Sequence, residues 1–282
     1  MKKSITTFLK HPTKDLSNRS ANPPVIRAST ILFDTMQELY MHEKKIKKHQ
    51  KVSHYSYGRY GSSTTIELEN ILKELENAYH VFLTGTGFGG VALALMSLCR
   101  PGDEILVSDN VYGPTKEISQ ELMKEFKVEA KFYNPDSLDD LDGKISDKTK
   151  MILVENPGSN TFEFQDLSKI VKVAKRKKIF TLLDNTWGTP LYLKPLKLGF
   201  DMSFCSATKY FSGHSDAMGG SLAVNKKVFK KIMFFYKLSG YRMSADEAYL
   251  IIRGLRTLDT RLKQHYDNTK TIINFLKKQK KN

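Results

Sequence analysis

The stretch Val81-Phe82-Leu83-Thr84-Gly85-Thr86-Gly87-Phe88-Gly89-Gly90 joins a short apolar run to a glycine-rich turn, and a helix is predicted directly after it, from Phe88 to Leu98. Its glycines let the backbone approach an anion closely, and free N–H groups at the start of the helix attract phosphate. The turn matches G-x-G-x-x-G, and Asp109 ends the next predicted strand, where a dinucleotide-binding fold places a ribose-binding acid. A dinucleotide and other phosphorylated cofactors would both use this turn, and a tight packing turn would contain the same small residues.

Outward from this turn, short apolar runs alternate with helical stretches. Further strands are predicted at 105–107, 151–154, 179–183, 202–205 and 221–224, and helices at 66–79, 115–126 and 166–178. Strands that alternate with helices predict an α/β fold, in which a mostly parallel sheet is sandwiched by helices. Residues 1–60 look irregular, with a break at Asn22-Pro23-Pro24, and residues 244–282 are expected to form one or two long helices.

The composition is that of a soluble globular protein, with 40% hydrophobic and 27% charged residues in a chain of 282. No apolar run is long enough to span a bilayer, and Met1–Lys10 has no small-residue cleavage site, so we expect a cytoplasmic protein without a membrane partner. The net charge of +15 comes from lysines spread along the chain, so we expect no nucleic-acid partner. Cys99 and Cys205 lie in apolar segments and fit no metal motif, which predicts buried free thiols and no bound metal.

A second motif, Leu182-Leu183-Asp184-Asn185-Thr186-Trp187, places an acid directly after an apolar strand. A side chain at the carboxyl end of a parallel strand points into the crevice where ligands bind. The alternative role for a lone aspartate at this position is a helix N-cap.

A third motif, Ser206-Ala207-Thr208-Lys209, also follows a predicted strand. A lysine that is desolvated at a strand end becomes nucleophilic, whereas a surface lysine is the alternative interpretation. The unusually small and polar loop Gly213-His214-Ser215-Asp216-Ala217-Met218-Gly219-Gly220 comes shortly after it. S-x-x-K is also a signature of serine acylases, but the chain has no K-T-G and only Ser215-Asp216-Ala217 in place of S-D-N, so this activity is not predicted.

Together, the three motifs supply the parts that pyridoxal 5′-phosphate requires at one edge of a sheet. Lys209 would form the Schiff base, Asp184 would pair with the ring nitrogen and keep it protonated, and the glycine-rich turn would anchor the phosphate. The alternative of another class is an NAD-binding Rossmann oxidoreductase. That alternative explains the first motif but leaves Asp184 and Lys209 without a role.

Six motifs also carry a resemblance to a known family. They are Tyr57-Gly58-Arg59-Tyr60-Gly61, Asp109-Asn110-Val111-Tyr112, Asn156-Pro157-Gly158-Ser159, Asp184-Asn185-Thr186-Trp187, Ser206-Ala207-Thr208-Lys209 and Gly213-His214-Ser215-Asp216-Ala217-Met218. With them the chain resembles the trans-sulfuration (Cys/Met metabolism) family of pyridoxal-phosphate enzymes, from about Ser17 to about residue 276. Four of these features are similar to the bacterial cystathionine β-lyase branch of the family rather than to its γ-synthases and γ-lyases. They are the Gly-Arg pair that follows Tyr57, the tryptophan at position 187, Pro-Gly-Ser at 157–159 and Asp-Ala-Met at 216–218.

The resemblance implies a role for each matching residue. Lys209 would hold the cofactor and carry protons, Asp184 would pair with the ring nitrogen, and Tyr112 would stack on the ring and assist acid–base steps. Tyr57 and Arg59 would reach the phosphate of a neighbouring subunit, which implies a dimer or tetramer. The remaining phosphate contacts are expected from the backbone of Gly87 and Phe88 and from the side chains of Ser206 and Thr208.

The resemblance further implies an aspartate-aminotransferase-like (type I) fold in three segments. These are an N-terminal arm (1–60), a cofactor-binding large domain (61–243), and a linking helix with the start of a C-terminal domain that is expected to be largely missing (244–282). The carboxylate-clamping arginine of the family would lie in that missing part, because Arg253, Arg256 and Arg261 do not match it.

The reaction implied by the resemblance is β-elimination of an amino-acid substrate, cystathionine, to homocysteine, pyruvate and ammonia in methionine biosynthesis. A cystathionine γ-synthase, a γ-lyase, a methionine γ-lyase and an inactive truncated remnant are the alternatives within the family.

Overall fold

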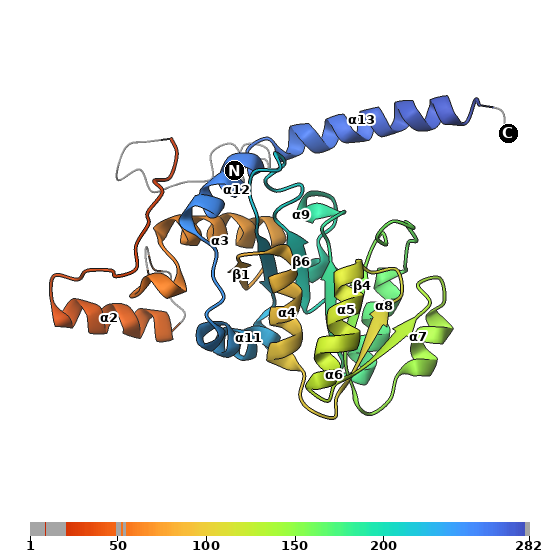
Figure 1. Cartoon of the computed structure of the whole chain (residues 1–282), viewed down its shortest axis with the longest axis horizontal. Coiled ribbons are helices and arrows are strands. Elements are labelled where there is room, and N and C mark those ends of the chain that lie inside the picture. The colour runs from red at the N-terminus through yellow and green to blue at the C-terminus, as the bar shows by residue number, and fades with distance from the viewer. Residues whose placement is uncertain (1–8, 10–20, 49–51, 53–54, 280–282) are drawn as a thin grey trace.

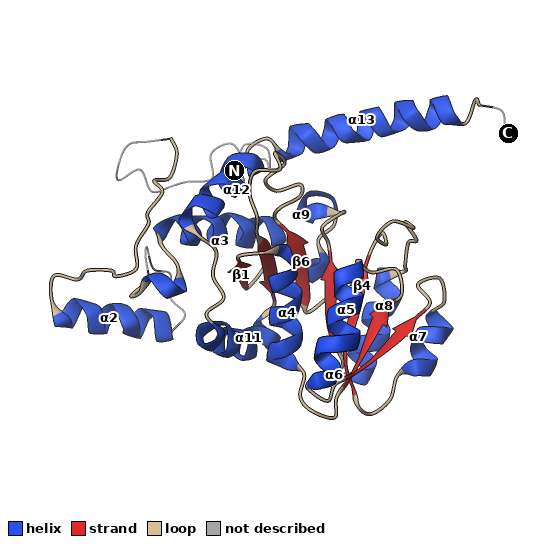
Figure 2. Ribbon diagram, viewed as in Figure 1, coloured by secondary structure: helices blue, strands red, loops and turns tan. Residues whose placement is uncertain are grey.

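A computed structural model describes residues 9, 21–48, 52 and 55–279. A seven-stranded sheet lies at the centre of the protein, with helices packed around it (Figure 1, Figure 2). The strands lie in the order β1-β7-β6-β5-β4-β2-β3. Six strands run in one direction and β7 runs against both of its neighbours, so the prediction of a mostly parallel sheet is confirmed. The bounds are β1 His80–Thr84, β2 Glu104–Ser108, β3 Glu129–Tyr133, β4 Thr149–Glu155, β5 Phe180–Asp184, β6 Met202–Ser206 and β7 Gly220–Val224.

Helices cover both faces of this sheet, because successive side chains of a strand point to opposite faces and both sets are apolar. On one face Val107 and Leu182 share a core with α4 and α11, and on the other face Leu106 and Leu183 share a core with α7 and α8. A third core, which includes Leu83, packs α3 and α12 against the β1 end of the sheet. The helix bounds are α3 Ser63–Glu76, α4 Gly87–Leu98, α5 Gly113–Glu117, a π-helical turn Ile118–Leu122, α6 Met123–Glu125, α7 Leu138–Lys144, α8 Leu167–Lys177, α9 Thr189–Tyr192, α10 Pro195–Leu198, α11 Lys226–Ser239, α12 Ala245–Leu255 and α13 Leu258–Leu276.

The N-terminal segment is not irregular throughout, so that sequence prediction is wrong for α2 (Met36–Lys47). The Thr35 side chain caps this helix by accepting a hydrogen bond from the Glu38 N–H at 3.1 Å. None of its residues is buried, so the sequence has no apolar stripe that would reveal the helix. The Met1–Lys10 segment apart from Leu9, the expected start of the resemblance at Ser17, and residues 280–282 lie outside the described residues.

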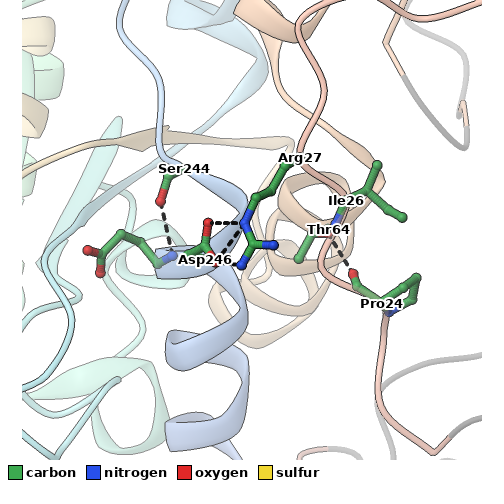
Figure 3. Close-up of polar contacts among 7 residues, drawn as sticks. Pro24, Ile26, Arg27, Thr64, Ser244 and Asp246 are labelled. Atoms are coloured by element: carbon green, nitrogen blue, oxygen red, sulfur yellow. Dashed lines mark hydrogen bonds and ion pairs between the residues drawn. The ribbon is translucent and has the colours of Figure 1, made fainter.

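The segment before α2 is attached to two helices that are distant in sequence (Figure 3). The Thr64 hydroxyl of α3 donates to the Pro24 carbonyl at 2.7 Å and accepts from the Ile26 N–H at 2.9 Å. The Arg27 Nε donates to both carboxylate oxygens of Asp246, in the first turn of α12, at 3.0 and 3.1 Å. These contacts connect the N-terminal segment to α3 and to α12.

The C-terminal region forms two helices, as expected. The first, α12, lies in the same core as α3 and the end of β1. The second, α13, begins in that core with Leu258 and Leu262 and then projects away from the body of the molecule (Figure 1). Its outer part has exposed apolar side chains, including Ile272 and Phe275. Within the described residues, no helix is both long and apolar enough to cross a membrane.

Candidate active site

The carboxyl ends of four parallel strands meet at one edge of the sheet. β1 ends at Thr84, β6 at Ser206, β5 at Asp184 and β4 at Glu155. Between β1 and β6, the reversed strand β7 starts at Gly220, which pairs with both Thr84 and Ser206. This edge therefore gathers the glycine-rich turn, the turn after β6, and two carboxylates, in the position where open α/β sheets bind ligands.

The glycine-rich turn packs directly against the end of β6. A Cβ added to Gly87 would lie only 2.4 Å from the Ser206 Oγ, so a side chain at this position would collide with Ser206. Thr86 caps α4, because its Oγ1 accepts a hydrogen bond from the Gly89 N–H at 3.0 Å. Phe88 is the second residue of α4, and its side chain is exposed. The start of α4 therefore lies against Ser206, and its first N–H groups and the Ser206 hydroxyl are groups that can donate hydrogen bonds to a phosphate.

Lys209 lies in a turn whose backbone is fixed at both ends. Its N–H donates to the Ser206 carbonyl at 3.1 Å, and its carbonyl accepts from the Gly213 N–H at 2.8 Å. Next to it, the Thr208 Oγ1 accepts from the Gly219 N–H at 3.0 Å. The Lys209 side chain itself is exposed. The turn therefore fixes the Lys209 backbone just after the end of β6, at the same sheet edge as Gly87.

Asp184 ends the neighbouring strand β5 and is held toward the same edge. Its Oδ1 accepts a hydrogen bond from the Thr186 N–H at 3.0 Å, and the Thr186 Oγ1 accepts from the Ser206 N–H at 2.9 Å. Burial raises the pKa of Asp184 to about 6, and the hydrogen bonds from Thr186 oppose that rise. Asp184 is therefore a carboxylate that a nearby cation would stabilise.

Glu155 is a functional candidate that the sequence reasoning missed. It is the register partner of Asp184 on β4, and it accepts hydrogen bonds from the Tyr112 N–H at 2.7 Å and the Ser159 hydroxyl at 2.6 Å. Burial raises its pKa to about 7, and the adjacent charge of Asp184 adds to the rise. The signal that could have revealed it is its position as an acid directly after the apolar run 151–154, as for Asp184.

Tyr112 lies at the same edge through its contact with Glu155. It precedes the first turn of α5, and its side chain is 53% exposed. A backbone fixed by Glu155 and an open aromatic ring are what a stacking platform over a cofactor ring requires.

Tyr57 and Arg59, in contrast, lie elsewhere in this chain. They belong to or flank the 3₁₀ turn Gly58–Tyr60, and both side chains are exposed. The Arg59 guanidinium carbon lies 5.6 Å from the centre of the Tyr57 ring. The Gly58 backbone packs directly against the backbone of Ala28, since a Cβ on Gly58 would lie 2.0 Å from the Ala28 carbonyl oxygen. In the part of the chain that is described, no hydrogen bond or ion pair joins Tyr57 or Arg59 to Lys209 or Asp184.

The strand order rejects the dinucleotide interpretation of the glycine-rich turn. That turn follows β1, whereas Asp109 follows β2, and the order places four strands between β1 and β2. At a strand spacing of about 4.8 Å the two strands are separated by about 24 Å, so Asp109 cannot bind the ribose of a nucleotide whose phosphate sits on the turn. Asp109 instead pairs with Lys116 at 2.7 Å.

The arrangement does fit pyridoxal 5′-phosphate. A lysine, the start of α4 packed against Ser206, and a carboxylate whose pKa burial raises follow the carboxyl ends of β6, β1 and β5 at one edge of the sheet. Among the described residues, neither Asp184 nor Glu155 forms an ion pair with a lysine or arginine, so their charge is available to a cationic ring nitrogen. Nor does the described part of the chain contain a group of three His, Cys, Asp or Glu side chains that could hold a metal ion.

The chain is similar to known proteins along nearly its whole length. The profile of the family described as Cys/Met metabolism PLP-dependent enzyme matches residues 6–282. An L-alanine/L-glutamate racemase of Wolbachia pipientis wMel is 35% identical over 268 residues, covering 93% of this chain and 66% of the racemase. A cystathionine beta-lyase of Bordetella avium is 32% identical over 280 residues, covering 97% of this chain and 70% of the relative.

A solved structure agrees with the fold. The cystathionine gamma synthase from Xanthomonas oryzae pv. oryzae, in complex with aminoacrylate and cysteine, superimposes with a TM-score of 0.89 at 28% identity, covering 99% of this chain and 70% of that one. The aspartate-aminotransferase-like fold is thereby confirmed. The chain spans 62%, 66% and 70% of the length of three of the curated relatives that it matches.

Proposed function

Because the chain belongs to the Cys/Met metabolism family of PLP-dependent enzymes, we propose that it is a carbon–sulfur lyase that acts on an amino-acid substrate by β-elimination. The substrate we infer is cystathionine, with homocysteine, pyruvate and ammonia as products. The observation that supports this proposal is that Lys209, Asp184 and the glycine-rich turn at Gly87 meet at one sheet edge. The similarity to the Bordetella avium lyase supports the choice of reaction.

The cofactor, when bound, supplies an electron sink for the carbanion that forms at the substrate Cα. The residues of this chain perform the remaining tasks. The N–H groups at the start of α4 and the hydroxyls of Ser206 and Thr208 would bind the phosphate, and Asp184 would pair with the protonated ring nitrogen. Lys209 would hold the cofactor, and its amine would also be the base that removes the proton from the substrate Cα. Tyr112 would stack on the ring, and its hydroxyl would serve as an acid for the leaving thiolate.

Racemisation of an amino acid is the second candidate function, because the racemase of Wolbachia pipientis wMel is also 35% identical to this chain. Both reactions begin with removal of the Cα proton by Lys209. They differ in the next step, since a lyase breaks the Cβ–S bond whereas a racemase returns a proton to the opposite face of Cα. The open ring of Tyr112 would place a hydroxyl acid near the site in either case.

We also propose that the active site is completed by a second copy of the chain. The exposed side chains of Tyr57 and Arg59 support this, because a tyrosine and a planar guanidinium suit contact with the phosphate of a neighbouring subunit. The lack of any described hydrogen bond or ion pair between them and Lys209 or Asp184 of their own chain supports the same assignment.

Spectroscopy of the purified chain with pyridoxal 5′-phosphate tests the cofactor assignment. We expect an absorption band near the visible edge, which Lys209→Ala abolishes and Lys230→Ala leaves unchanged, because Lys230 is an exposed lysine on α11. Absence of the band in the unchanged chain, or its persistence in Lys209→Ala, contradicts the assignment.

Substrate assays then distinguish the reactions. Release of pyruvate from cystathionine supports the lyase, and exchange of the Cα proton of L-alanine for solvent deuterium, without pyruvate, supports the racemase. A chain that shows the band but neither activity is a cofactor-binding remnant, and the proposed lyase function is then wrong.

A further inference from the structure

Glu155 and Asp184 form a carboxylate pair at the end of the sheet. They are register partners on the parallel neighbours β4 and β5. Partners in register point to the same face, and neighbouring strands are about 4.8 Å apart, so the two side chains leave the sheet side by side. Glu155 is thus a second carboxylic acid that lies next to Asp184, the acid that is expected to face the cofactor ring.

The two members of the pair have different contacts. Both oxygens of Glu155 are occupied, one by the Tyr112 N–H at 2.7 Å and the other by the Ser159 hydroxyl at 2.6 Å. Asp184 is bound through one oxygen, by the Thr186 N–H at 3.0 Å. Asp184 therefore keeps an oxygen for a ligand, whereas Glu155 can influence a ligand only through Tyr112 and through its charge on Asp184.

Other charged and titratable groups lie on β6 and α3, in the turn after β6, directly after β2, and on α5. On β6, Cys205 has a raised pKa from burial, from Glu76 of α3 and from the pair's aspartate. Lys209 lies in the turn after β6. On the other side, Asp109 after β2 is neutralised by Lys116 of α5 at 2.7 Å. Among these groups Lys116 is paired with Asp109, and Lys209 is the remaining cation at this edge of the sheet.

We propose that Glu155 is a positioning residue of the cofactor site. It holds the Tyr112 backbone at the edge of the site and, by its charge, sets the pH at which Asp184 becomes an ionic partner for the protonated ring nitrogen. The inference rests on the proposed function, since it assumes that pyridoxal 5′-phosphate binds at this edge.

The direction in which cofactor affinity changes with pH follows from the presence of two adjacent, buried carboxyl groups. One negative charge raises the proton affinity of the other, so the pair retains a proton to a higher pH than a single acid would. Burial is the main cause of the raised pKa values of Asp184, about 6, and Glu155, about 7, and the charge of Asp184 adds to the rise for Glu155. Cofactor affinity should therefore increase as the pH rises through this range, because Asp184 must be ionised to pair with the ring nitrogen.

The test measures the affinity for pyridoxal 5′-phosphate as a function of pH, by quenching of the fluorescence of Trp187, the one tryptophan of the chain and a near neighbour of Asp184 in sequence. Glu155→Gln keeps the shape of the side chain and an acceptor for the Tyr112 N–H but removes the charge. We expect it to move the pH midpoint of binding downward by about one unit. Glu155→Asp should restore the midpoint although it binds more weakly, because it keeps the charge and shortens the reach to Tyr112.

Asp109→Asn is the matched control, because it removes one carboxylate from the same sheet edge outside the pair, and we expect no shift. The inference is overturned if Glu155→Gln keeps the midpoint of the unchanged chain, or if Asp109→Asn shifts it as far. If the unchanged chain does not bind the cofactor, the proposed function fails together with the inference. If it binds and only the shift is missing, the inference alone is wrong.

Discussion

Gly254 of α12 is the position where one added methyl group should most clearly disturb the active-site turn. A Cβ there would lie 2.2 Å from the Ser212 carbonyl oxygen and 2.3 Å from that of Phe211. Both distances are about 1 Å shorter than the ~3.3 Å at which carbon and carbonyl oxygen normally touch. The obstacles are backbone atoms of the turn that begins at Lys209, so no side-chain rotation can relieve the contact.

That turn cannot easily move away from α12. The Ser212 N–H donates to the Ala207 carbonyl at 3.0 Å, and Arg261 of α13 links the two sides by donating to the Tyr210 carbonyl at 2.7 Å and the Gly254 carbonyl at 2.9 Å. Overpacking of a close-packed site costs about 1–3 kcal/mol, and alanine recovers up to about 1 kcal/mol of helix propensity over glycine. Because the obstacles are rigid, we take the overpacking cost at the upper end of its range, about 3 kcal/mol, and subtract about 1 kcal/mol for the gain in helix propensity. Gly254→Ala should therefore lower the free energy of unfolding by about 2 kcal/mol.

The measurement is urea unfolding followed by the fluorescence of Trp187, whose ring centre lies 6.4 Å from that of Tyr210 in the affected turn. The midpoint should fall for Gly254→Ala, and cofactor affinity should fall with it, because the backbone that carries Lys209 is displaced. Gly143→Ala is the control: Gly143 lies in α7 with no atom within 4 Å of an added Cβ, so it should gain about 0.5–1 kcal/mol. An unchanged or higher midpoint for Gly254→Ala would refute the reasoning.

Two further predictions concern stability away from the cofactor site. Glu69 is buried on α3 with the Tyr55 hydroxyl 2.8 Å from its carboxylate, and burial raises its pKa to about 8 from an ordinary value of 4.5. The folded state therefore binds a proton that the unfolded state has released, so this group's contribution to stability falls as the pH rises from 4.5 to about 8. Glu69→Gln should thus gain stability over the unchanged chain as the pH rises through that window in thermal unfolding scans; a difference independent of pH would contradict the assignment. Arg27→Ala should leave the urea midpoint of unfolding unchanged within measurement error, although Arg27 contacts Asp246. Both side chains are exposed, so water screens the ion pair. A clear decrease of the midpoint would show instead that the pair holds the N-terminal segment in place.

The secondary structure can be predicted from the sequence where the apolar pattern is strong and not where it is weak. The buried strands at the centre of the sheet and the amphipathic helix α8 are predicted nearly at their observed bounds. The edge strand β3 is not predicted because its residues are largely half-exposed, and α2 is not predicted because none of its residues is buried. Periodicity reports burial, so elements that bury little leave no signal in the sequence.

The site can be predicted in its parts but not in its pairings. Lys209, Asp184 and Gly87 are recognisable because each lies next to the end of an apolar run, and strand ends of one direction gather at one edge. Glu155 satisfies the same rule, but the sequence does not single it out, since its importance depends on the register that places it beside Asp184. Register describes how two strands pair, so it cannot be predicted from the sequence of one strand alone.

The sequence by itself determined the local chemistry of this protein: an α/β chain with a phosphate-binding turn, an acid and a lysine at strand ends, and membership of the trans-sulfuration family. Only the tertiary structure decided the strand order, which puts Asp109 about 24 Å from the glycine-rich turn and reverses β7 between β1 and β6. The physical reason is that local periodicity follows from the burial of each segment, whereas strand order follows from the packing of both sheet faces against helices that are distant in the chain. That packing also created the carboxylate pair beside Tyr112.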